Sequence, residues 1–107
     1  MNGPITEMAA FNQRPKVYAG PNQTIIVDTG GAHLRGTASD DGLPNPPGKL
    51  SYYWSKVSGP HKVSFTAPHS LTTTATFGGV PGIYVLKLAV TDGQLWASDT
   101  VTITVRR

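Results

Sequence analysis

The chain has 107 residues, of which 38% are hydrophobic and 14% charged, with 12 glycines, 9 prolines and no cysteine. This length fits one domain with a single core, and the absence of cysteine excludes disulfides and thiolate metal sites. The net charge of +3 comes from dispersed lysines and arginines. Nucleic-acid binding needs a clustered basic stripe and a membrane span needs roughly 18 apolar residues in a row, so we predict no nucleic-acid partner and no membrane insertion.

The first 13 residues show no hydrophobic period, and the Asn-Gly-Pro sequence at residues 2–4 favours a turn or a loose tail. We predict a flexible tail or linker over residues 1–13 and one folded domain over residues 14–107. The first strand signals lie at residues 16–19 and 24–27. The Gly-Pro pair between them is typical of a sheet edge, because proline cannot donate to a strand ladder.

Alternation continues at residues 32–36, where Ala32 and Leu34 are predicted to face inward. Residues 37–49 are rich in Asp, Asn, Gly and Pro, and we predict a long loop that forms neither helix nor central strand. The next strand signal, over residues 50–57, places Leu50, Tyr52 and Trp54 on one face. Because a buried indole contributes strongly to a core, Trp54 is the predicted core centre.

The longest uninterrupted strand signal covers residues 82–92, between a Pro-Gly and an Asp-Gly turn. Two short strands are expected before it, around residues 63–65 and 75–77, and a final strand follows over residues 95–105. The residues predicted to face the core are Tyr84, Leu86, Leu88 and Val90 in the long strand and Val101, Ile103 and Val105 in the last.

Seven to eight short strands, regular turn signals and no helical period predict an all-β protein, an antiparallel β-sandwich. Two features favour an immunoglobulin-like arrangement. Trp54 lies on the strand that carries the buried tryptophan of such folds, and Tyr84 lies where a tyrosine corner returns its hydroxyl to upstream backbone. Leu86 takes the place of the second cysteine of antibody domains, so we predict that an aliphatic contact replaces the disulfide.

Four segments also carry a family resemblance: VYAGPNQTI (residues 17–25), LRGTASDDG (34–42), YWSKVSGP (53–60) and GIYVLKLAVTDG (82–93). In this order they resemble the PKD (polycystic kidney disease) domains, in particular the variety found in large bacterial surface and secreted proteins. One departure stands out. Many members carry Trp-x-Phe-Gly-Asp-Gly where this chain has Trp54 followed by SKVSGP.

The resemblance implies a non-catalytic extracellular or cell-surface module, a spacer or adhesion and protein-interaction unit, within a larger multidomain protein. The implied partners are neighbouring domains of the same polypeptide and protein or polysaccharide at the cell surface, and we expect a monomer. The alternative is a carbohydrate-binding module that is accessory to a polysaccharide-degrading enzyme.

Acidic residues supply a candidate metal site. Asp40 and Asp41 follow one strand and Asp92 follows another, and in a sandwich these two loops meet at one end. Carboxylates and loop carbonyls are the oxygen ligands that Ca²⁺ prefers. Asp99 is a weaker fourth member, because its parity points inward. The other interpretation is that Asp40 and Asp41 cap turns and Asp92 sets an Asp-Gly hairpin.

Exposed aromatic residues supply a candidate ligand surface. Trp96, Tyr53 and Tyr18 fall on outward or loop positions by parity, and exposed rings can stack on sugar rings. The other interpretation is that Trp96 covers an edge of the core, since single exposed aromatics are common. The two differ in whether Trp96 and Tyr53 lie on one flat face.

The chain contains histidine and serine, the residue types of nucleophilic catalysis, but not in the sequence arrangement that such catalysis requires. His33, His61 and His69 fall in one outward strand position and two loops. No Gly-x-Ser-x-Gly elbow presents a serine, and the histidine spacing is not that of a zinc site. We therefore predict that the chain is not an enzyme.

Overall fold

The computed structural model describes residues 14–27, 31–39 and 50–107, and all of the regular structure in these ranges is β-strand. The predicted tail at residues 1–13 and the part of the predicted loop at residues 40–49 lie outside them. The strands are β1 (Lys16–Tyr18), β2 (Gln23–Ile26), β3 (Ala32–Arg35), β4 (Thr37–Ser39), β5 (Ser51–Ser58), β6 (Ser64–Phe65), β7 (Thr72–Thr76), β8 (Gly82–Thr91) and β9 (Trp96–Arg106).

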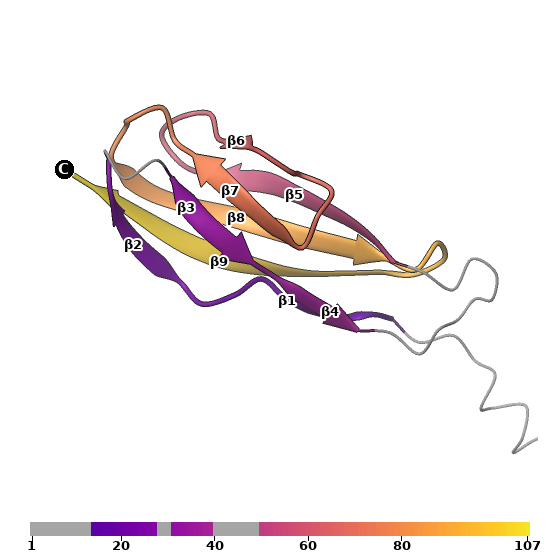
Figure 1. Cartoon of the computed structure of the whole chain (residues 1–107). Helices are drawn as coiled ribbons and strands as arrows, with labels where there is room; N and C mark the ends of the chain where they lie inside the picture. Colours follow the sequence, from indigo (N-terminus) through magenta and orange to yellow (C-terminus); the bar gives the residue numbers. More distant parts are fainter. Residues whose placement is uncertain (1–13, 28–30, 40–49) are drawn as a thin grey trace, which may run out of the picture.

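The strands form two packed layers (Figure 1). One layer is a four-stranded sheet in the order β2-β9-β8-β5, and the other is a three-stranded sheet in the order β3-β7-β6. A two-stranded sheet of β1 and β4 extends one end. Every pairing is antiparallel except that of β2 with β9, which is parallel. The predicted immunoglobulin-like β-sandwich is confirmed.

The described ranges hold nine strand segments, eight of which overlap the predicted strands, and β4 is the addition. The Gly-Pro interruption separates β1 from β2, and Gly36 separates β3 from β4. The predicted loop over residues 37–49 begins too early, because residues 37–39 form β4, although β4 is not a central strand. Its residues pair with β1, from Lys16 opposite Ser39 to Tyr18 opposite Thr37. This pairing lies at a sheet edge, and the residues that oppose strand formation begin only at Asp40.

The core lies between the layers, with β8 at its centre. Alternation with a period of two sends every second β8 side chain inward, and all four of these are fully buried, at 0% exposure. They belong to the same hydrophobic core cluster as Leu34 and Ala75 of the opposite layer. The buried apolar residues are Ala19, Ala32, Leu34, Trp54, Ala75, Phe77, Tyr84, Leu86, Leu88, Val90, Val101, Ile103 and Val105.

The predicted tyrosine corner is present. The Tyr84 hydroxyl donates a hydrogen bond to the Val80 carbonyl oxygen at 2.7 Å. Gly59 lies against the Tyr84 ring with a φ of 146°, and a Cβ there would overlap the ring. Pro60 packs on Gly82 in the same way. The Ser-Gly-Pro sequence therefore packs against the first residues of β8 and fixes their position.

Trp54 is 5% exposed and is fixed by three kinds of contact. Its indole Nε1–H donates to the Ser70 carbonyl oxygen at 2.8 Å, and its ring stacks on Phe65 with centroids 6.3 Å apart. A Cβ at Gly36 would overlap Leu88 Cδ2 and lie 3.3 Å from Trp54 Cζ2. The glycine of the Leu-Arg-Gly segment therefore leaves room for this tryptophan.

The described chain enters and leaves at opposite ends of the sandwich. The Ala19 backbone N–H donates to Asp99 Oδ2 at 2.8 Å, near the start of β9. Ile26 pairs with Arg106 at the end of β9. The C-terminus lies at that far end (Figure 1), so the chain crosses the full length of the molecule.

Candidate functional site

The outward face of the four-stranded sheet carries an exposed aromatic pair. Trp96, the first residue of β9, is 55% exposed, and Tyr53 on β5 is 40% exposed. Between these strands runs β8, where Ala89 faces Tyr53 and Thr91 faces Trp96 in the register. The small side chain of Ala89 lets the two rings meet above β8.

A third ring extends this pair. The Tyr53 and Trp96 centroids are 5.5 Å apart with an interplanar angle of 43°, and His69 meets Tyr53 edge-on at 5.1 Å and 87°. His69 Nδ1 lies 3.2 Å from the Tyr52 carbonyl oxygen, which holds the imidazole beside β5. We call Trp96, Tyr53 and His69 the aromatic strip.

The strip borders a hollow and an uncharged stretch of sheet. The hollow has a volume of about 490 Å³ and is lined by Leu50, Ser51, Tyr52, Tyr53 and His69. The cross-strand neighbours of Trp96 and Tyr53 are small or carry a hydroxyl group. Ser51 and Thr91 lie in the same row of the sheet as Trp96, and Ala89 and Ser98 lie in the same row as Tyr53.

The predicted outward positions of Trp96 and Tyr53 match their exposure, but the rings do not form one flat face. At 43° to each other, they cannot both stack on a single planar ring. Their role in ligand stacking stays a prediction. The sequence did not indicate His69 as a neighbour. The position of His69 depends on the hydrogen bond from the Trp54 backbone N–H to the Pro68 carbonyl oxygen (2.9 Å), and no periodic pattern in the sequence reveals this bond.

Of the candidate calcium ligands, Asp92 and Asp99 lie within the described residues. Asp99 Oδ2 accepts the backbone N–H of Ala19 at 2.8 Å. Asp92 is fully buried, and its Oδ1 accepts the backbone N–H groups of Gln94 at 2.9 Å and Leu95 at 2.8 Å. These bonds close the turn between β8 and β9. In the described ranges no three metal-binding side chains cluster. Asp40 and Asp41 lie outside these ranges, and the calcium site stays a prediction.

The three histidines lie apart and bond to other groups than serine. His33 Nδ1 lies 3.1 Å from Thr74 Oγ1, and His61 Nδ1 lies 2.8 Å from the Lys62 carbonyl oxygen. As described above, His69 contacts the Tyr52 carbonyl. Within residues 14–27, 31–39 and 50–107, no histidine is paired with a serine hydroxyl, whereas His33 is paired with the hydroxyl of Thr74.

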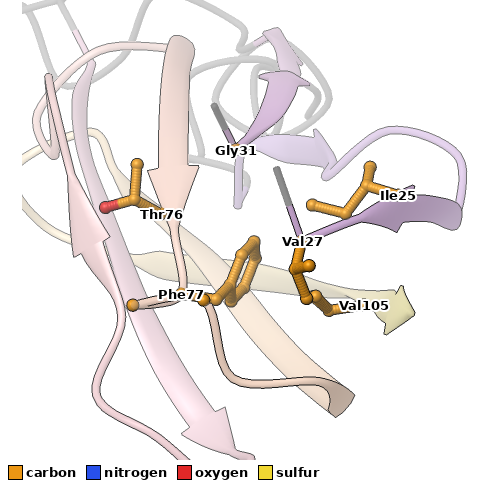
Figure 2. A pocket seen from close by; sticks show the side chains of 8 residues that line it. Ile25, Val27, Gly31, Thr76, Phe77 and Val105 are labelled. Carbon is orange, nitrogen blue, oxygen red and sulfur yellow. The ribbon is translucent and has the colours of Figure 1, made fainter. Parts of the chain in front are cut away.

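A second hollow, of about 240 Å³, lies at the other end of β9. Figure 2 shows the side chains of Phe77, Val27 and Val105 gathered around it, with Ile25 beside them. The lining is almost wholly apolar, and Thr76 supplies the one side-chain hydroxyl. A binding site usually adds several polar groups that fix a ligand's orientation, so this hollow suggests no specific small molecule. The described residues also contain no helix that is long and apolar enough to cross a membrane.

Comparison with known proteins supports the family and corrects one expectation. The family model described as "K319L-like, PKD domain" matches residues 19–105. The mouse dyslexia-associated protein KIAA0319 homolog is 32% identical over 104 residues, and the rat protein 31%. These matches cover 96% of this chain but only 9% of each relative. Since these relatives are animal proteins, the narrower expectation of a bacterial surface variety is not supported.

Solved structures agree with this assignment. The solution structure of the PKD domain from the KIAA 1837 protein has a TM-score of 0.67 at 30% identity, with 84% of each chain covered. The PKD domain of human KIAA0319 has a TM-score of 0.70 at 21% identity, with 99% of this chain and 88% of that chain covered. The segments that resemble PKD domains are also those that pack the core, at Gly36, Trp54, Gly59 and Tyr84. The chain belongs to the K319L-like PKD domain family.

Proposed function

We propose that this chain is a non-catalytic module of a larger extracellular protein, where it acts as a spacer between neighbouring domains. The observation that carries this proposal is the path of the chain, which enters beside the start of β9 and leaves at its end. A module of this kind adds its full length between the domains that it joins. The small share of the relatives that it covers, 9%, fits one module among many.

The family segments support a structural role. Gly36 makes room for Trp54, Gly59 makes room for Tyr84, and Pro60 packs on Gly82. Each of these residues shapes the sandwich, and in the described ranges no histidine is paired with a serine hydroxyl. The domain limits, with a linker at residues 1–13 and a folded unit at residues 14–107, are part of this proposal, as is a monomeric state.

The experiment replaces the module inside its parent protein. We expect an unrelated immunoglobulin-like sandwich of similar length to preserve cell-surface display and adhesion, whereas deletion of residues 14–107 shortens the protein and reduces both. If the replacement fails as badly as the deletion, the module acts through its own surface and the spacer proposal is wrong. The parent protein carrying Tyr53→Ala and Trp96→Ala then tests whether that surface is the aromatic strip.

A second candidate function is favoured by the aromatic strip itself. Exposed aromatic rings beside hydroxyl-bearing side chains suit a carbohydrate ligand, because the apolar faces of sugars pack on rings and their hydroxyls find hydrogen-bond partners. The predicted role beside a polysaccharide-degrading enzyme depends on neighbouring domains and stays a prediction.

A further inference from the structure

We propose that the aromatic strip binds a single neutral polysaccharide chain that lies across the strands of the four-stranded sheet. Trp96, Tyr53 and the hollow beside His69 contact successive sugar units. This inference rests on the second candidate function. It specifies which surface binds the polysaccharide, in which direction the polysaccharide crosses the sheet, and that the polysaccharide is neutral.

The direction follows from the sheet topology. In the order β9-β8-β5, Trp96 comes from the first strand and Tyr53 from the third. The segment that carries His69 lies beyond β5, because the Pro68 carbonyl accepts the Trp54 backbone N–H. The rings therefore succeed one another across the strands, with centroid steps of 5.5 and 5.1 Å. Each step is comparable to the length of one sugar unit in an extended chain.

The tilt of the rings favours a separate chain over a crystalline surface. The 43° angle between Tyr53 and Trp96 rules out one flat platform, which a crystalline polysaccharide needs. A chain in solution rotates from one unit to the next, so its sugar faces can meet two inclined rings in turn. Beyond Tyr53, the hollow of about 490 Å³ offers room for the unit that follows.

The surroundings favour a neutral ligand. The rows that hold Trp96 and Tyr53 contain Ser51, Thr91 and Ser98, and no charged residue occurs in them. The exposed hydroxyls of Ser51 and Ser98 can donate and accept hydrogen bonds, as a sugar requires. The Thr91 hydroxyl is already bonded to the Leu95 carbonyl oxygen and the Gly93 N–H. An acidic polysaccharide needs clustered lysines or arginines, and the nearest one in the register, Lys87, lies in the next row, opposite Ser55 and Thr100.

An extended peptide fits this surface less well. A peptide that adds to a sheet edge needs unpaired backbone groups along the outer strand. At the edge of β5, the Trp54 N–H is bonded to Pro68 and the Tyr52 carbonyl to His69. Two of the groups that a peptide would use are therefore already occupied.

Affinity electrophoresis of the 107-residue chain tests the proposal, with hydroxyethylcellulose, xylan or galactomannan in the gel as neutral probes and polygalacturonate as the acidic probe. We expect at least one neutral polymer to retard the protein. Trp96→Ala and Tyr53→Ala should each weaken that retardation about tenfold or more, as expected for a central aromatic contact. His69→Ala should weaken it less, because its ring meets Tyr53 edge-on.

Ile83→Ala is the matched control. Ile83 is 63% exposed on the same outward face and pairs with Thr104 near the far end of β9, so its removal should leave retardation unchanged. Circular dichroism establishes that each variant is folded. A pull-down on microcrystalline cellulose completes the comparison, and we expect it to capture little protein.

Each other outcome contradicts a stated part of the proposal. Retardation that survives both aromatic substitutions leaves the carbohydrate function standing but overturns the aromatic strip as its site. Stronger retardation by polygalacturonate, or capture by crystalline cellulose alone, overturns the charge class or the single-chain ligand. If no polymer retards the chain, the carbohydrate function and this inference both fail, whereas the spacer proposal is unaffected.

Discussion

The two tryptophans of the chain lie on opposite faces of one sheet, and they show what a tryptophan does in each setting. Trp54 is 5% exposed and Trp96 is 55% exposed. Trp54 has a fixed hydrogen bond, a stacked phenylalanine and a glycine that makes room for it, whereas Trp96 meets one tilted ring beside solvent. The alternation of side chains along β5 and β9 decides which face each one takes.

The difference predicts that changes on the inner face affect folding and changes on the outer face affect binding. Inner side chains are packed on all sides, so a lost or added atom leaves a cavity or a clash. Outer side chains can lose atoms with little effect on stability.

The largest effect is expected for Trp54→Ala. Removing a buried aromatic side chain lowers the free energy of unfolding by about 3–5 kcal/mol. The control is Trp96→Ala, for which we expect a change within about 0.5 kcal/mol, as for most surface substitutions. Urea denaturation followed by circular dichroism measures both. Equal losses in the two variants would contradict the comparison.

A clash beside Trp54 is expected to have the next largest effect. Gly36→Ala places a Cβ against Leu88 Cδ2, and Leu88 is fully buried, so any shift of its side chain disturbs the packed core. We expect a loss of about 1–3 kcal/mol, typical of an overfilled core. Leu88→Val removes the clashing atom, so Gly36→Ala should cost less in that background. Strict additivity of the two changes in denaturation measurements would show that the clash is not the cause.

Tyr84→Phe tests the tyrosine corner. Loss of the hydrogen bond to Val80 should lower stability by about 1 kcal/mol at neutral pH. Burial also raises the pKa of the Tyr84 phenol above its usual value of 10.0. The unfolded chain therefore loses this proton at a lower pH than the folded chain, and stability falls as the pH rises beyond 10.

The phenylalanine variant lacks this phenol and should lose less stability over the same alkaline range. Denaturation curves at neutral pH and at successive alkaline values measure the difference. If the two proteins lose stability in parallel above pH 10, the Tyr84 phenol does not cause the alkaline loss.

The smallest effect is expected for calcium. The Asp92 carboxylate is buried and already accepts two backbone N–H groups, which satisfies the turn without a cation. We expect millimolar calcium to leave the melting temperature of the chain nearly unchanged. A clear rise, absent with magnesium and absent in Asp40→Asn, would instead support the predicted calcium site.

The sequence predicted the inner face of the sandwich well, because burial imposes a period of two. Leu34, Trp54 and the four alternate residues of β8 are buried as expected. The tyrosine corner was predictable from a local pattern. The parallel pairing of β2 with β9 was not, since it joins residues about 80 positions apart and no local signal specifies the direction of a partner strand.

The outer face was only partly predictable. Parity places Trp96 and Tyr53 outward, but it does not give the angle between their rings, which depends on the small Ala89 between them. His69 joins them through a hydrogen bond in an irregular segment. Segments without a period leave such neighbours invisible to sequence reasoning.

The parallel pairing of β2 with β9 also determines how the module bears a load. If neighbouring domains pull on its two ends, β2 is drawn toward the start of β9 while β9 is drawn the other way. The backbone hydrogen bonds between Gln23–Ile26 and residues 103–106 then resist the force together in shear, and do not open one by one. If the module is the spacer that we propose, this pairing should help it to keep its length under tension.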